Sequence, residues 1–163
     1  MAEQTCFIAL GSNLGDRPKN LARARLLLAD KVEVIKTSSI YETDPWGVTD
    51  QPRFLNQVVE GKTSMTAADL LRFLKQIEQE LGRRKTYRYG PRTIDLDILI
   101  LGDLVLDTPD LTIPHPRIAE RAFVLVPLSE LAPDLLLPGS QKTIRDLLAA
   151  SGTSGVKLYE GAV

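Results

Sequence analysis

The residues best suited to chemistry in this chain are Asp95 and Asp97, two positions apart in the apolar run 94–101. If the run is a β-strand, both carboxylates project from one face, with Cα atoms about 6.5 Å apart. The other face would then carry Ile94, Leu96, Ile98 and Ile100. Two adjacent carboxylates repel, and a divalent cation with oxygen ligands would compensate their charge. The alternatives are a solvated face of an edge strand and acids paired with nearby arginines.

A basic segment lies just upstream, at residues 83–92. It contains no acid, and five of the chain's 20 Lys and Arg residues lie in it: Arg83, Arg84, Lys85, Arg88 and Arg92. Planar guanidinium groups suit phosphate oxygens, so the segment predicts an anion site on a loop bracketed by glycines. The alternatives are an exposed basic loop and an RNA-binding loop whose Tyr87 and Tyr89 stack on bases.

A magnesium-bound polyphosphate would satisfy the acid pair and the basic segment together. The carboxylates would hold the metal while the arginines bind phosphate oxygens, which is the arrangement of phosphoryl transfer. The usual glycine-rich phosphate loops are missing from the sequence. Residues 11–16 could replace one at a helix N-terminus, although a plain tight turn explains them as well.

Other candidates have an ordinary explanation beside the functional one. His115 stands between two prolines, followed by Arg121, and would donate to a phosphate oxygen or be a simple loop residue. Phe54 and Phe123 would belong to the core or would enclose a flat ring whose edge Asn56 reads.

The elements that must position these residues alternate between strand and helix. Periodicity and capping signals predict strands at 5–10, 32–41, 54–62 and 94–101, and helices after Asp16, at 66–81 and at 143–149. A two-residue turn at 102–103 predicts a hairpin into 104–106. Residues 43–52 are expected to be a loop, and 123–131 a mixed apolar segment. This order predicts an α+β fold with a ferredoxin-like core, mostly antiparallel, with helices on its faces.

Composition sets the class of protein. The chain has 163 residues, 44% hydrophobic and 25% charged, which fits one globular domain over 1–163. A net charge of −1 argues against a general attraction to nucleic acid or membranes. With one Cys and one His, an internal disulfide and a His-rich metal site are excluded. We see no targeting or membrane-spanning segment and expect a soluble, cytoplasmic protein. The oligomeric state is left open.

Over residues 5–135 the chain closely resembles the 6-hydroxymethyl-7,8-dihydropterin pyrophosphokinases of folate biosynthesis. The matching stretches are ALGSNLGD (9–16), FLN (54–56), GPRTIDLDI (90–98), PHPR (114–117) and ERAFVL (120–125). The resemblance implies a ferredoxin-like fold and transfer of pyrophosphate from ATP to the pterin's hydroxymethyl oxygen, releasing AMP. The alternative function is a ferredoxin-like RNA-binding module that uses the basic loop 83–92.

The resemblance also implies roles for single residues. Asp95 and Asp97 would hold two Mg²⁺ ions, with Arg83 and Arg92 as catalytic arginines. The ATP-binding residues would be Glu78, Arg84, Lys85, Arg88, Ile98, Thr112, His115 and Arg121. The pterin-binding residues would be Thr43, Asp44, Pro45, Trp46, Phe54, Asn56 and Phe123. Partners would be these small molecules, without nucleic acid or membrane. Three features depart from the family pattern: Tyr89, where some members carry Trp; Lys75, where some carry Gln; and the basic loop, which is one residue shorter than in the longest-studied members.

Overall fold

The computed structural model describes residues 2–44, 50–82 and 92–161, and its core is a β-α-β-β-α-β unit. In chain order this unit comprises β1 (Gln4–Ser12), α1 (Arg17–Leu28), β2 (Glu33–Thr37), β4 (Phe54–Thr63), α2 (Ala67–Glu80) and β5 (Asp95–Leu101). The strands lie in the order β5-β1-β4-β2, and every one of these pairings is antiparallel. The predicted α+β fold with a ferredoxin-like core is therefore confirmed.

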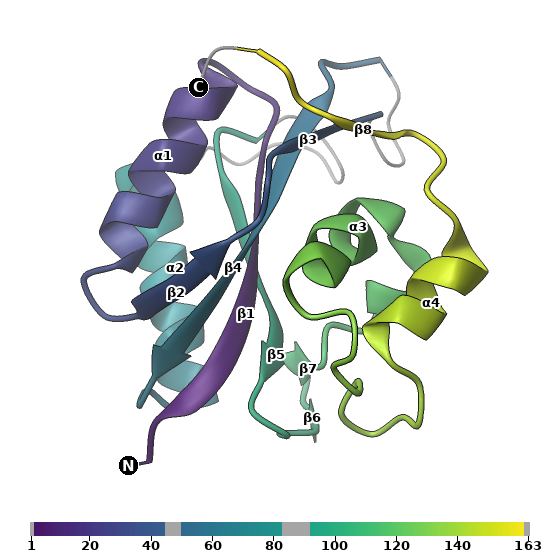
Figure 1. Ribbon diagram of the computed structural model, residues 1–163. Coiled ribbons are helices and arrows are strands. Elements are labelled where there is room, and N and C mark those ends of the chain that lie inside the picture. Colours follow the sequence, from purple (N-terminus) through teal and green to yellow (C-terminus); the bar gives the residue numbers. More distant parts are fainter. Residues whose placement is uncertain (1, 45–49, 83–91, 162–163) are drawn as a thin grey trace.

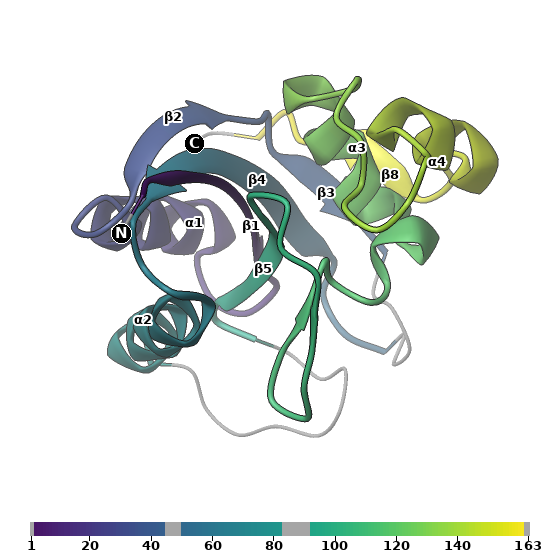
Figure 2. The ribbon, with the colours of Figure 1, turned by 90° about the horizontal axis from the view of Figure 1, so that it is seen from below.

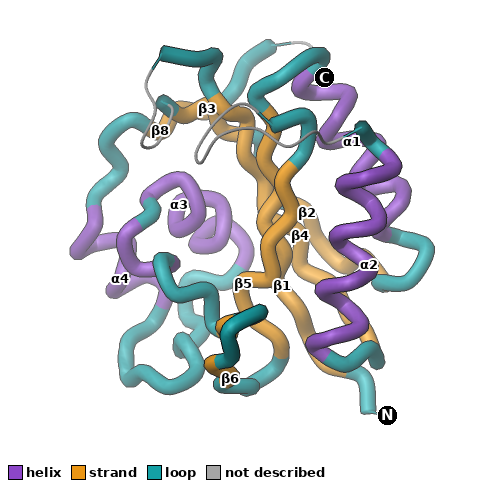
Figure 3. The backbone as a smooth tube through the Cα atoms, turned by 180° about the vertical axis from the view of Figure 1, so that it is seen from behind, coloured by secondary structure: helices purple, strands orange, loops and turns teal. Residues whose placement is uncertain are grey.

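Helices cover both faces of the sheet (Figures 1 and 2). The helices α1 and α2 pack on one face, and α3 (Ala122–Leu131) and α4 (Ile144–Ser151) pack on the other. Figure 3 shows the sheet between these two layers. Two apolar cores result, one containing Leu21 and Leu74 and the other Val58 and Leu125. The sheet thus separates two packed layers, as its alternating burial requires.

The helix boundaries follow the predicted capping signals. The Asp16 carboxylate accepts a hydrogen bond from the backbone N–H of Lys19 (3.3 Å), and Thr66 Oγ1 accepts one from that of Asp69 (3.1 Å). Gly82, with φ +82°, follows α2 in the left-handed conformation that a side chain would disfavour. Within the described residues, no helix combines the length and the apolar character needed to cross a bilayer.

The predicted hairpin at 102–103 is wrong. The turn forms, with Leu104 N–H donating to Leu101 O (3.0 Å), but the chain does not return along β5. Instead β6 (Leu106–Asp107) pairs with β7 (Thr112–Ile113) in a separate two-stranded sheet. On the edge of β5 that faces away from β1, the backbone N–H of His115 donates a hydrogen bond to Leu99 O (2.9 Å). The segment that follows β7 therefore takes the place expected for 104–106.

The predicted strand 32–41 is broken in two. It becomes β2 and β3 (Tyr41–Thr43), because Ser38 leaves the regular ladder and its Oγ accepts a hydrogen bond from Val58 N–H (2.9 Å). The mixed apolar segment 123–131 is helical in α3. The last dozen residues, which gave little signal, contain β8 (Val156–Leu158), which pairs antiparallel with β3.

A β-bulge interrupts the pairing of β1 with β5. Phe7 lies opposite Ile100 and Ile8 lies opposite Ile98, so Leu99 is an extra residue in β5. As a result, Ile100 packs in the core beneath α3 and α4, whereas Leu96 and Ile98 pack beneath α1 and α2. The expectation that Ile100 shares a face with these residues is therefore wrong. The two aspartates precede the bulge and keep the predicted alternation.

Candidate active site

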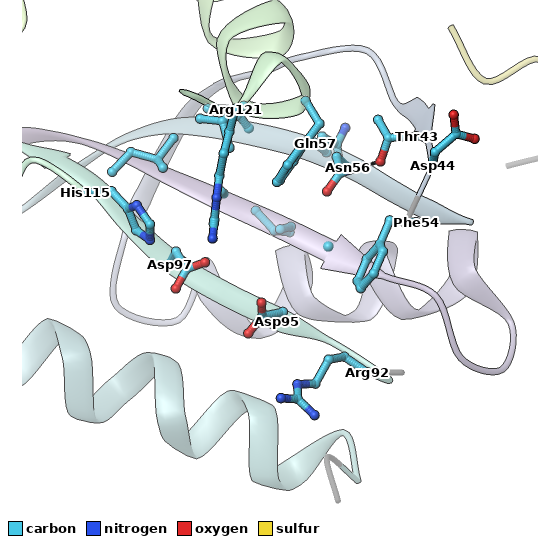
Figure 4. A pocket seen from close by; sticks show the side chains of 17 residues that line it. Thr43, Asp44, Phe54, Asn56, Gln57, Arg92, Asp95, Asp97, His115 and Arg121 are labelled. Carbon is cyan, nitrogen blue, oxygen red and sulfur yellow. Dashed lines mark hydrogen bonds between the residues drawn. The ribbon is translucent and has the colours of Figure 1, made fainter. Parts of the chain in front are cut away.

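The two aspartates occupy the first half of β5. Asp95 lies opposite Gly11 and Asp97 opposite Ala9 in the pairing with β1, and the intervening Leu96 is buried on the other face. Both carboxylates therefore project from one face, as predicted, and both line a cavity of about 300 Å³ (Figure 4).

This cavity brings together described residues from distant parts of the sequence. Its walls come from β1, β3, β4, β5, the segment before α3 and the first turn of α3. The predicted site residues that line it are Thr43, Asp44, Phe54, Asn56, Arg92, Asp95, Asp97, His115, Arg121 and Phe123. In Figure 4, Phe54, Asn56 and Thr43 lie toward one end, away from His115. One cavity therefore combines an aromatic and amide-lined end, flanked by Asp44 and Arg92, with an end where Asp97, His115 and Arg121 gather, here called the charged end.

A second cavity, of about 270 Å³, lies between α2, β5 and residues 108–116. The predicted residues Ile98 and Thr112 line it, as does Lys75. Asp97 and His115 line both cavities. The two spaces thus meet at the second aspartate and the histidine, so a ligand in one would lie near a ligand in the other.

Glu78 lies behind the acid pair. Its side chain is 1% exposed; Oε2 accepts a hydrogen bond from Leu96 N–H (2.8 Å), and Oε1 lies 3.4 Å from Lys75 Nζ. Because Leu96 stands between the two aspartates, this bond fixes the backbone that carries them. The structure therefore places Glu78 as a support of β5, with Lys75 between it and the second cavity.

Six of the predicted site residues cannot be placed. Arg83, Arg84, Lys85, Arg88, Pro45 and Trp46 lie outside the described residues. Arg92, which ends the basic segment, is described and lines the first cavity.

The acid pair is electrostatically unfavourable without a cation. Burial, and then the like charge of Asp95, raise the pKa of Asp97 to about 7, while the nearby Arg121 guanidinium acts in the opposite direction. In the metal-free protein Asp97 therefore binds a proton far more tightly than an ordinary aspartate. A divalent cation would supply the missing positive charge.

His115 is neutral at physiological pH. Burial, and then the charge of Arg121, lower its pKa to about 4. Its Nδ1 accepts a hydrogen bond from Arg117 N–H (3.2 Å), which assigns the ring proton to Nε2. The side chain therefore offers one N–H donor, as a phosphate oxygen would require.

Asn56 has a fixed orientation. It is 8% exposed, and its Nδ2 donates to Thr43 Oγ1 (2.7 Å). Its Oδ1 faces Gly11, where an added Cβ would lie 3.2 Å from this oxygen and 3.6 Å from Phe54 Cδ1. A glycine at position 11 thus leaves open the space beside the ring and the amide.

Comparison with known proteins identifies the family. Residues 7–133 match the 7,8-dihydro-6-hydroxymethylpterin-pyrophosphokinase family, which is most of the chain. The chain belongs to this pterin pyrophosphokinase family. The predicted resemblance is confirmed.

Named relatives and solved structures agree with this assignment. The 2-amino-4-hydroxy-6-hydroxymethyldihydropteridine pyrophosphokinase of Bacillus subtilis is 54% identical over 127 residues, covering 77% of this chain and 76% of the relative. The Pseudomonas aeruginosa protein of the same name is 43% identical over 162 residues, covering 98% and 99%. A crystal structure titled as HPPK-DHPS in complex with substrates matches with a TM-score of 0.72 at 16% identity, covering 91% of this chain. The chain spans 43% of that longer chain, and this likeness concerns the fold alone.

Sequence reasoning missed Asn13, which joins two segments at the candidate active site. Asn13 is 1% exposed. It exchanges hydrogen bonds with the Arg92 backbone, from Asn13 N–H to Arg92 O (3.0 Å) and from Arg92 N–H to Asn13 Oδ1 (2.7 Å). Its Nδ2 donates to Gln51 Oε1 (2.8 Å) and Pro52 O (3.1 Å). Asn13 therefore joins the end of the basic segment to the loop before β4. The only sequence signal was its place in the glycine-rich stretch 11–16.

We expect Asn13→Ala to lower kcat/KM by about ten- to hundredfold, because small misplacements of reacting groups cost that much. Initial rates with both substrates give the measurement. Asn20→Ala is the matched control, since buried Asn20 donates to Ser12 Oγ (3.1 Å) and Leu14 O (2.8 Å) and so holds the same turn without touching residues 51, 52 or 92. Equal losses in both variants, corrected for the folded fraction, would show that Asn13 only stabilises the turn.

Proposed function

We propose that the protein transfers the pyrophosphoryl group of ATP to the hydroxymethyl oxygen of 6-hydroxymethyl-7,8-dihydropterin and releases AMP, a step of folate biosynthesis. It is accordingly an ATP-dependent diphosphotransferase, as its family is. The observation that carries the proposal is the position of Asp97 and His115 on both cavities, next to Asp95. Two substrates bound in these cavities would meet at the acid pair.

The pterin is assigned to the aromatic end of the first cavity. Phe54 and Phe123 would stack on its flat ring, and Asn56 would read the ring's edge. Asn56 suits this role because its bond to Thr43 fixes which amide atom faces the cavity. Thr43, Asp44, Pro45 and Trp46 would complete the pterin site.

ATP is assigned to the second cavity and to the charged end of the first. Ile98 and Thr112 would line the nucleotide, and Nε2–H of His115 would donate to a phosphate oxygen. The cationic residues proposed for the phosphates are Arg83, Arg84, Lys85, Arg88, Arg92 and Arg121. Glu78 would contribute on the ATP side through the backbone bond that supports β5.

The donor set fits Mg²⁺ bound to ATP. In the described part of the chain, no group of three His, Cys, Asp or Glu residues gathers into a self-sufficient metal site. Mg²⁺ commonly uses one or two carboxylates and takes its other ligands from substrate phosphates and water. Asp95 and Asp97 would hold two such ions, which supply charge neutralisation of the triphosphate.

The reaction exchanges one phosphorus–oxygen bond for another. The hydroxymethyl oxygen attacks the β-phosphorus, and the bond from that phosphorus to the oxygen of the α-phosphate breaks, so AMP leaves. Asp97 would orient the hydroxyl group or accept its proton. Arg92 and Arg121 would stabilise the negative charge on the phosphate oxygens in the transition state.

A direct experiment is to mix the protein with ATP, Mg²⁺ and the reduced pterin and to identify the nucleotide product. We expect AMP, formed only when the pterin is present and abolished when a chelator removes Mg²⁺. ADP as the product, or AMP release that does not depend on the pterin, would contradict the proposal.

The RNA-binding alternative receives no support from the comparisons, and the net charge of −1 also argues against it. We expect ATP and the reduced pterin to be the partners and the cytoplasm to be the site of action.

A further inference from the structure

The C-terminal residues 153–160, here called the C-terminal strap, complete the sheet beside the first cavity. Within the strap, β8 pairs with β3, with Val156 opposite Thr43 and Leu158 opposite Tyr41 (Figure 1). Beyond β8, Tyr159 N–H donates to Ile40 O (2.9 Å). The short strand β3 is therefore held on one side by β4 and on the other by the strap.

Side chains anchor the strap to the elements around β3. Tyr159 packs against the core beneath α1 and α2, and the Arg17 guanidinium lies over its ring, 5.8 Å from the centroid. Arg17 also donates to Glu42 Oε2 (2.8 Å) and to Arg53 O (2.9 Å). One guanidinium thus connects the strap to residues on both sides of the segment 43–52.

The strap lies directly beside a wall of the first cavity. Thr43, which pairs with Val156 of the strap, and Asp44, which follows it, both line this cavity. At Gly155, with φ +80°, an added Cβ would lie 3.5 Å from Asp44 Oδ2. Figure 4 shows Thr43 and Asp44 at the end of the cavity near Phe54. A shift of the strap would therefore move the wall assigned to the pterin.

We propose that the C-terminal strap is a positioning element that sets the affinity for the reduced pterin and leaves the affinity for the nucleotide unchanged. The inference rests on the proposed function. The second cavity is lined by residues from α2, β5 and 108–116 and by none from β3 or the strap. If only a fraction of molecules holds β3 in place, the apparent dissociation constant of the pterin rises by the reciprocal of that fraction.

Two substitutions in the full-length protein test the proposal. Tyr159→Ala removes the ring beneath Arg17, and Lys157→Pro removes a backbone N–H from β8, where Lys157 lies opposite Glu42. The matched controls are Tyr159→Phe and Lys157→Ala, which keep the ring and the backbone donor. Each protein is titrated with Mg²⁺ and a non-hydrolysable ATP analogue, and then with the reduced pterin while this nucleotide is kept at saturation.

We expect the pterin dissociation constant to rise about fivefold or more in Tyr159→Ala and Lys157→Pro. The nucleotide dissociation constant should change by less than about twofold, as should both constants in the controls. Equal weakening of both ligands, or a lower unfolding temperature with unchanged pterin affinity, would overturn the proposal, because the strap would then only stabilise the fold. If the unsubstituted protein, saturated with Mg²⁺ and the ATP analogue, fails to bind the pterin, the proposed function itself fails, and this is seen before any substitution is compared.

Discussion

Asp97→Asn is expected to lower turnover by about a thousandfold or more, because it removes a metal-binding carboxylate from the point where the two cavities meet. The asparagine keeps the size of the side chain but replaces one carboxylate oxygen with an NH₂ group, so the negative charge and one oxygen ligand are lost. AMP release at saturating substrate measures the effect. Asp103→Asn, an exposed change just beyond β5, is the control and should leave turnover unchanged. Near-normal AMP release by Asp97→Asn would refute the role of the acid pair.

The same substitution is expected to stabilise the metal-free protein at neutral pH. Because the folded state raises the pKa of Asp97 to about 7, it binds the proton more tightly than the unfolded chain does. The stabilisation from this proton is complete below the unfolded pKa and is lost as the pH rises through about 7. Removing the charge should therefore raise the free energy of unfolding by about 1–3 kcal/mol near pH 8, with little change near pH 3. Thermal unfolding at the two pH values gives the comparison, and a lower stability at pH 8 would contradict it.

Arg121→Met is expected to lower kcat by about a hundred- to thousandfold, the cost of removing one transition-state donor. The Arg121 side chain points into the first cavity toward Asp97 and His115 in Figure 4, and its guanidinium carbon lies 5.5 Å from the centroid of the Phe123 ring. It therefore lies at the charged end of the cavity, beside Asp97, where a phosphate would carry its charge.

The controls for Arg121 separate charge from fold. Arg121→Lys retains the charge and loses the planar fork, so it should recover only part of the activity. Arg145→Met removes an exposed arginine of α4 that pairs with Asp134, and this change should alter neither kcat nor stability appreciably. The idea fails if Arg121→Met retains most of the activity, or if Arg145→Met loses as much.

The parts of the fold that local pattern determines were predicted well. Thr66 and Gly82 mark the ends of the second helix, and strand alternation places Asp95 and Asp97 on one face without reference to any other segment. The missed features depend on partners far away in the sequence. The bulge at Leu99 exists only in the pairing of β5 with β1. The hairpin fails because His115, and not residues 104–106, bonds to the outer edge of β5. The strand β8 forms only through its pairing with β3.

The site shows the same division. The acids, the cations and the aromatic residues have distinctive side chains, so their types and order pointed to a polyphosphate and a flat ring. Asn13 and Tyr159 act by holding other segments, through bonds to the backbone of Arg92 and Ile40. A single sequence does not reveal such bonds, because they depend on the register of segments that meet only in the folded chain.

The extra residue in β5 has a consequence for how the chain tolerates change. Before Leu99, the faces of the strand to which successive side chains point are set by the need to direct both aspartates into the cavity. After Leu99, they are set by packing beneath α3 and α4. The bulge uncouples these two requirements, so Ile100 reaches the core beneath α3 and α4 while Asp95 and Asp97 keep their direction into the cavity. Deleting Leu99 would restore strict alternation along the whole strand, so either the aspartates or the residues after position 99 would point to the wrong face. A one-residue deletion there should therefore be less well tolerated than most substitutions at the same position.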